Sequence, residues 1–154
     1  MAQSALHVRP AAPDDAARLL AWRNDGATRA QSRHGAEIGW DAHCQWLARM
    51  LADDGCVFLI GEVAGEAVGT VRFNRGEGGV WEVSIVMAPA ARGRGLGGVL
   101  LGAGIGHLRT LYPMAEILAA VRAGNQASEA LFQRAGFVPS PSPEAGFAHF
   151  LLQA

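Results

Sequence analysis

The chain has 154 residues, half of them hydrophobic, and a formal net charge of −1 at pH 7. This length and hydrophobic content predict a single domain over residues 1–154 with a substantial core. The nearly balanced charge, without any basic block, argues against nucleic acid or an anionic membrane surface as the main partner.

Two further absences in the sequence narrow the class of protein. No apolar run is long enough to span a bilayer, and the first residues, MAQSALHVRP, lack the features of a signal peptide, so we expect a cytoplasmic protein. All thirteen basic residues are arginine, which excludes a Schiff-base lysine and a Walker-type phosphate lysine. Cys44 and Cys56 lie in apolar settings without metal-site spacing, so no metal is expected.

The first half of the chain predicts helices between strands. Pro13 fits the first turn of a helix, and Trp40, Cys44, Leu47 and Leu51 recur at helical spacing. The predicted order is a strand at 5–11, a helix at 13–24, a loop or short helix at 25–39, a helix at 40–53 and three strands within 56–88.

The second half begins with a glycine-rich stretch and alternates helices with strands. Pro113 ends the first helix, and Asn125 and Gly136 suit the start and the end of the second. The predicted order is a helix at about 96–111, a strand at 115–123, a helix at 125–136 and two strands in the tail. The whole order predicts an α/β fold with a sheet of mixed direction.

The glycine-rich stretch, ARGRGLGG at residues 91–98, lies between the apolar runs VSIVMAP and VLLGAGIGHL. The first backbone N–H groups of a helix have no partners within the helix, and glycines allow an anion to approach them closely. Arg92 and Arg94 add positive charge. The stretch therefore predicts a site for a phosphate or pyrophosphate at the start of the second-half helix.

The glycines fit two patterns. Gly93, Gly95 and Gly98 satisfy G-x-G-x-x-G, the dinucleotide fingerprint. That fingerprint requires an acidic residue at the end of the next strand, where this chain reads AAVRA. The sequence therefore supports binding of a nicotinamide cofactor less well than it supports the second pattern.

The second pattern is R-x-x-G-x-G, which resembles the coenzyme A pyrophosphate loop of the GNAT superfamily of N-acetyltransferases. The segment NQASEALFQRAGF, residues 125–137, is similar to a second motif of that superfamily. The resemblance implies the GNAT fold, a mixed central sheet flanked by helices on both faces, with acetyl-CoA as cofactor. It implies that the cofactor is bound by Arg92, Gly93, Arg94, Gly95, Leu96, Gly97, Gly98, Asn125, Ser128 and Phe132, and by the backbone of Ile85, Val86, Met87 and Ala88.

The N-terminal part resembles the GNAT members that acetylate a nucleotide-linked aminosugar, as in pseudaminic acid biosynthesis. The matching residues are Trp22, Arg23, Asn24, Arg29, Ser32, His43 and Trp46. The resemblance implies a small-molecule amine as the acceptor, with Arg23, Asn24 and Arg29 binding its phosphates. Ribosomal-protein N-terminal acetyltransferases share parts of this pattern, so a protein N-terminus is the alternative acceptor.

Two residues are candidates for the general base. Strand alternation places Glu82 on the same face as Ser84 and Val86, toward the acceptor, although an ion-paired strand glutamate explains it equally well. His43 is the second candidate because imidazole titrates near neutrality, but a histidine on a helix more often has a structural role.

Phe132 departs from the superfamily. Many GNAT enzymes have a tyrosine there that protonates the leaving thiolate, and phenylalanine has no proton to donate. Tyr112, the only tyrosine, does not match the motif. Either water or another residue protonates the thiolate, or the protein is a coenzyme A binding module without turnover. The oligomeric state stays open, a homodimer being one option.

Overall fold

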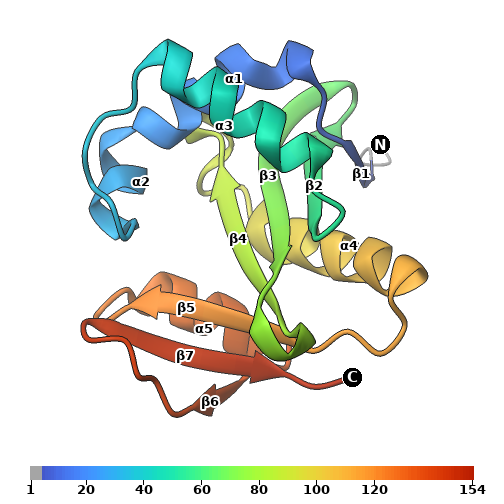
Figure 1. The fold of residues 1–154 in the computed structure, drawn as a ribbon, viewed down its shortest axis with the longest axis vertical. Helices are drawn as coiled ribbons and strands as arrows, with labels where there is room; N and C mark the ends of the chain where they lie inside the picture. Colours follow the sequence, from blue (N-terminus) through green and yellow to red (C-terminus); the bar gives the residue numbers. More distant parts are fainter. Residues whose placement is uncertain (1–4) are drawn as a thin grey trace.

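The computed structural model describes residues 5–154, and a seven-stranded sheet of order β1-β2-β3-β4-β5-β7-β6 runs through them (Figure 1). Neighbouring strands are antiparallel except β4 and β5, which are parallel. The strands are β1 (Leu6–Pro10), β2 (Cys56–Val63), β3 (Glu66–Arg75), β4 (Trp81–Met87), β5 (Ile117–Arg122), β6 (Val138–Ser140) and β7 (Phe147–Leu152). The α-helices are α1 (Ala16–Asn24), α2 (Gly26–Gln31), α3 (Trp40–Ala52), α4 (Leu96–Leu111) and α5 (Gln126–Arg134).

The mixed α/β sheet predicted from the sequence is confirmed, and several elements have the predicted bounds. Helix α4 begins and ends at the expected residues, and α2 is the short helix left open within residues 25–39. Residues 5–154 also contain three short 3-10 helices, at Pro13–Asp15, Glu77–Gly79 and Pro89–Ala91. Within the described residues, no helix is long and apolar enough to cross a membrane.

The sheet separates two hydrophobic cores. Alternate residues of β2 point to opposite faces, so Leu59 joins one core while Phe58 and Ile60 join the other. Helix α4 buries Leu100 and Leu108 in the first core. Helices α1 and α3 close the second core from the other face, as Figure 1 shows.

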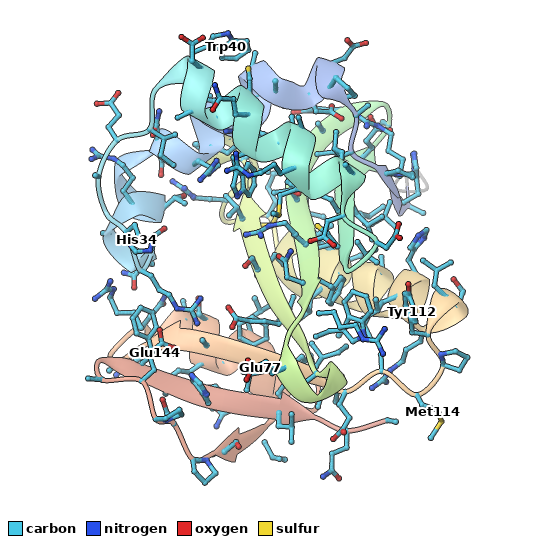
Figure 2. All side chains as sticks on the ribbon, in the orientation of Figure 1. His34, Trp40, Glu77, Tyr112, Met114 and Glu144 are labelled. Atoms are coloured by element: carbon cyan, nitrogen blue, oxygen red, sulfur yellow. The ribbon has the colours of Figure 1, made fainter. Side chains whose placement is uncertain are left out.

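Helix α3 buries the face that the helical spacing predicts, except at its first residue: Leu47 lies in the second core, and Cys44 and Leu51 pack against it. His43 and Leu47 are its buried residues, whereas Trp40 is 51% exposed. Trp40 is the first residue of α3 and lies at the periphery of the molecule (Figure 2), where the helix start extends past the second core. Cys44 is half-buried, as expected.

Strands β4 and β5 pair only over a short distance. Three residue pairs are in register: Trp81 with Ile117, Glu82 with Leu118, and Val83 with Ala119. Beyond them, β4 continues to pair with β3 through Met87, while β5 continues to pair with β7 through Arg122. The two strands diverge, and the edge of β4 from residue 84 onward has no strand partner on the β5 side (Figure 1).

Helix α4 approaches the sheet closely through a glycine, and this contact makes a testable prediction. A Cβ at Gly104 would lie 2.6 Å from Cγ1 of Val71 and 3.4 Å from Cε2 of Phe73. Gly104→Val should therefore lower the free energy of unfolding by about 2 kcal/mol through overpacking, measured by urea denaturation. Gly102→Val is the matched control, because a Cβ at Gly102 meets nothing within 4 Å, and its free energy of unfolding should stay within about 0.5 kcal/mol of wild type. Equal effects of the two substitutions would contradict the packing of α4.

Candidate active site

A cleft of about 830 Å³ opens where β4 and β5 diverge. One wall is the β4 edge, where Ile85, Val86 and Met87 line the cleft. Helix α5 and β5 form the wall below, and α2 with the loop that follows it covers the other side. The glycine-rich stretch lies between the end of β4 and the start of α4. Arg92 is the residue of this stretch that lines the cleft, and residues 93–98 lie outside the lining.

The glycine-rich stretch has the geometry predicted for an anion site. Gly93 has φ 76° and Gly95 has φ 72°, in the left-handed region that favours glycine. A Cβ at either position would meet nothing within 4 Å, so the backbone is open to a ligand. Gly95 is the residue before α4, a helix of 16 residues whose first N–H groups are free of helical partners.

The other residues of the stretch have different surroundings. A Cβ at Gly97 or Gly98 would contact Cδ1 of Leu131, at 3.5 and 3.9 Å, so these glycines lie beside α5. Arg94 is exposed. Arg92 lines the cleft, and its Nη2 donates to Oδ2 of Asp25 at 2.6 Å, which lowers the pKa of that carboxyl.

Helix α5 places three predicted cofactor residues in the cleft lining. Asn125 caps the helix as predicted, because its Oδ1 accepts from the backbone N–H of Ser128 at 3.3 Å. Its Nδ2 also donates to Oγ of Ser128 at 3.0 Å. Phe132 is 4% exposed and packs edge-on against Phe137, with ring centroids 5.2 Å apart. Ala88, by contrast, is buried beyond β4 and is not part of the lining; its N–H donates to the carbonyl of Val68.

Of the three residues predicted to bind the acceptor, only Arg23 lines the cleft. The side chain of Asn24 makes two hydrogen bonds with the backbone of Ile38: it donates to the carbonyl and accepts from the N–H, both at 2.8 Å. Arg29 donates to the carbonyls of Asn24 and Gly35. Asn24 and Arg29 therefore shape the loop between α2 and α3, which contributes residues to the lining.

Glu82 lies in the cleft lining and is paired with Arg33, a residue that the sequence analysis did not single out. Arg33 donates to both carboxylate oxygens of Glu82, at 2.7 and 3.3 Å, and to Oε1 of Glu144 at 3.0 Å. Figure 2 shows the loop that carries His34 reaching toward the segment that carries Glu144. Arg33 thus ties that loop to β4 and to the turn before β7. The only signal in the sequence was a cluster of charged residues in a polar stretch.

His43, the other candidate base, is fully buried and does not line the cleft. Its Nε2 lies 2.9 Å from the carbonyl of Ala16, and its Nδ1 lies 2.9 Å from Nη1 of Arg23. Burial lowers the pKa of the imidazole, which favours a neutral ring that donates from Nε2 and accepts from Arg23 at Nδ1. The structure therefore places His43 behind Arg23.

Arg72 of β3 is a second cleft residue that sequence analysis missed. Its guanidinium stacks over the ring of Trp46, 5.0 Å from the centroid, and Arg23 stacks over the same ring at 3.9 Å. The sequence signal was a lone arginine in the strand AVGTVRF. No group of His, Cys, Asp and Glu side chains in residues 5–154 has the arrangement of a metal site.

The site fits a coenzyme A thioester. An open left-handed glycine turn at a helix start suits a pyrophosphate, and the diverging β4 edge offers free backbone groups to an amide-containing chain. These are the features of an acyl-CoA N-acyltransferase.

Residues 5–138 match the family model of the acetyltransferase (GNAT) domain, so the chain belongs to the GNAT family. It is an acetyl-CoA-dependent N-acetyltransferase, and this membership decides between the two patterns that the glycines fit.

Solved structures agree with the family. The ribosomal-protein-alanine N-acetyltransferase from Brucella melitensis is 26% identical, with 96% of this chain and 99% of that chain covered and a TM-score of 0.78. The Salmonella typhimurium protein yncA, whose structure contains its cofactor acetyl-CoA, is 25% identical, with 97% and 94% covered and a TM-score of 0.75. Spermidine N-acetyltransferase from Vibrio cholerae shares the fold at 16% identity, with 95% and 92% covered and a TM-score of 0.82. Among curated proteins, no significant match was found.

The Arg33 pairing predicts a specific acid sensitivity. The hydrogen bond from Arg33 lowers the pKa of Glu144 from 4.5 to about 2, so the folded state gains stability above the ordinary pKa and loses it as pH falls from about 4.5 to 2. Glu144→Gln removes this titration, so the stability of the variant should fall less steeply over that interval. At pH 7 the variant should lose less than about 1 kcal/mol, because the pair is near the surface. Urea denaturation at pH 7, 4.5 and 3 measures both effects, and parallel curves for the two proteins would contradict the pairing.

Proposed function

We propose that this enzyme transfers acetyl directly from acetyl-CoA to a primary amine in a ternary complex, and that the amine belongs to a nucleotide-linked aminosugar. The observation that carries the choice of acceptor is the cluster of arginines in the cleft lining on the side away from the glycine turn: Arg23, Arg33 and Arg72. A peptide N-terminus gives no reason for so many cations, whereas a phosphorylated acceptor does.

The cofactor would be held by the glycine turn and the diverging strand. Acetyl-CoA supplies a thioester-activated acetyl group. Residues 93–98 would bind its pyrophosphate through backbone N–H groups, and Arg92 and Arg94 would add charge. The free edge of β4 at Ile85, Val86 and Met87 would bond the pantetheine arm and stabilise the oxyanion that develops at the acetyl carbonyl.

Glu82 is the proposed proton acceptor, acting through water. Its carboxylate lines the cleft with a side chain 33% exposed, and each of its oxygens has lone-pair capacity beyond the bond from Arg33. His43 would act indirectly, by holding Arg23 in place. The leaving thiolate would be protonated by water, because Phe132 has no proton to donate and Tyr112 packs against Trp81 beside the C-terminal end of α4, outside the cleft lining.

A protein N-terminus is the second candidate acceptor. The observation in its favour is the likeness to the ribosomal-protein-alanine N-acetyltransferase from Brucella melitensis. The two acceptors make opposite demands on the cleft, since a peptide needs an open groove and a sugar nucleotide needs cations.

The deciding experiment has two stages. Calorimetric titration with acetyl-CoA, with NAD as control, measures cofactor binding; thiol release is then measured against aminosugar nucleotides and N-terminal peptides. Turnover confined to the aminosugar nucleotides would support the proposal. Turnover confined to peptides would replace it with the second candidate, and binding without any turnover would overturn both.

The glycine turn gives a direct test of cofactor binding. Gly95→Asp should weaken acetyl-CoA binding at least about 30-fold relative to Gly95→Asn, because the carboxylate would lie against the pyrophosphate. Asparagine has nearly the same shape, tolerates the left-handed conformation and is neutral, so it isolates the charge. Calorimetry of both folded variants makes the comparison. Equal affinities would show that the pyrophosphate binds elsewhere.

The role of Glu82 is tested by the pH dependence of turnover. Glu82→Gln should lower kcat/KM about 10- to 100-fold below the pKa of the acceptor amine, where a proton must be removed, and much less above it. Glu144→Gln is the matched control, because it also removes a carboxylate partner of Arg33 but has no proposed proton role. Parallel pH profiles for Glu82→Gln and wild type would show that the acceptor amine loses its proton directly to solvent, without Glu82.

A further inference from the structure

Trp46 and two arginines form a cationic cluster beneath the acceptor side of the cleft. Arg23 and Arg72 both stack over the Trp46 ring, at 3.9 and 5.0 Å from its centroid. Beside them a pocket of about 60 Å³ adjoins the main cleft; its remaining lining is mainly apolar, with the hydroxyl groups of Thr70 and Ser84 as the other polar groups. This volume holds about two water-sized groups.

Neither guanidinium has a carboxylate within 4.0 Å among the residues that the structure describes. Arg72 bonds to neutral atoms, Oδ1 of Asn74 at 2.5 Å and Oγ of Ser84 at 3.4 Å. Arg23 bonds to Nδ1 of His43 at 2.9 Å. Glu82 acts on Arg72 only at longer range, by raising its pKa, and the carboxylate of Glu82 is already paired with Arg33.

Arg23 and Arg72 are half-buried, and holding two unpaired cations side by side in such surroundings is unfavourable. Burial, with a contribution from Arg72, lowers the pKa of Arg23 to about 10, and burial also lowers the pKa of Arg72. Charges taken out of water are normally paired with an opposite charge or coordinated, and a charge left without a partner is costly. A ligand that brings a negative charge to this place would supply the missing partner and use donors that Arg23 and Arg72 still have.

We propose that Arg23, Arg72 and Trp46 form a subsite that binds one compact anionic group, a carboxylate or a phosphate, carried by the acceptor amine. This assignment deepens the proposed function and rests on it only in taking the ligand to be the acceptor. The anionic group of the acceptor would lie in the small pocket that Ser84 lines. Ser84 follows Val83, the last residue of β4 that pairs with β5. The enzyme would thus select amines by a charge held at a fixed distance from the acetyl group.

The first test requires no acceptor. The side-chain Nε–H signals of Arg23 and Arg72 are followed by ¹⁵N NMR while inorganic phosphate, acetate or chloride is added at constant ionic strength. Arg23→Lys and Arg72→Lys assign the signals. Arg75 is the matched control, because it lies in the same strand and stacks on Trp81, away from the cleft lining.

Saturable shifts of the Arg23 and Arg72 signals with phosphate or with acetate, but not with chloride, would support the subsite and identify which anion it prefers. Shifts that merely follow those of Arg75, or no shifts, would overturn it and leave the stack on Trp46 as a structural contact.

The second test uses kinetics with matched acceptors. Glucosamine 6-phosphate is compared with glucosamine, and β-alanine with β-alaninamide. The anionic member of at least one pair should have the higher kcat/KM, and Arg72→Gln or Arg23→Gln should raise its KM about 10- to 100-fold without changing the KM for acetyl-CoA. Arg72→Lys should recover part of the loss, and Arg75→Gln should behave as wild type.

The failures of the two proposals are distinguishable. Equal use of neutral and anionic amines by wild type, with no NMR shifts, would overturn the subsite and leave acetyl transfer intact. Saturable NMR shifts without thiol release from any amine would support the subsite and overturn the proposed function.

Discussion

The site depends on the short parallel pairing of β4 with β5. After three residue pairs the strands part, because β4 follows β3 toward the glycine turn while β5 stays with β7. The separation creates the cleft and leaves backbone polar groups of β4 without strand partners. Burying such backbone groups without a hydrogen-bond partner costs free energy, so they stay exposed to solvent or bind a ligand. The same divergence opens the cleft between helix α5 on one side and α2 with its following loop on the other, and Arg92 before α4 contacts the start of α2.

The charges around the cleft differ between the two places where the proposed function puts its ligands. In the proposed complex the glycine turn would attract an anion mainly through backbone dipoles, because Arg92 is already bonded to Asp25. The acceptor side would rely on side-chain charges, since Arg33 is paired with two carboxylates while Arg23 and Arg72 are not. Because all of these cations are arginines, even Arg23, whose pKa burial lowers to about 10, keeps its charge at neutral pH.

Local signals in the sequence predicted much of the fold. A glycine stretch and Pro113 bracket α4, and Asn125 caps α5, because each acts through its own backbone neighbourhood. The glycine turn was predictable for the same reason. Arg33 and Arg72 were not, because their partners come from distant segments of the chain. Helical spacing suggested an apolar face for α3 but could not show that His43 would be buried on it while Trp40 remained exposed.

The bond between Arg92 and Asp25 has a consequence for the order of binding. Arg92 belongs to the glycine turn, yet it holds the residue that caps α2, and α2 covers the acceptor side of the cleft. A phosphate that draws Arg92 away from Asp25 would loosen that cap, whereas an acceptor that orders α2 would hold Arg92 in place. Thermodynamic linkage makes such an effect reciprocal, so each ligand would change the affinity for the other by the same factor. One ion pair would therefore be enough to couple cofactor binding to acceptor binding in the proposed ternary complex.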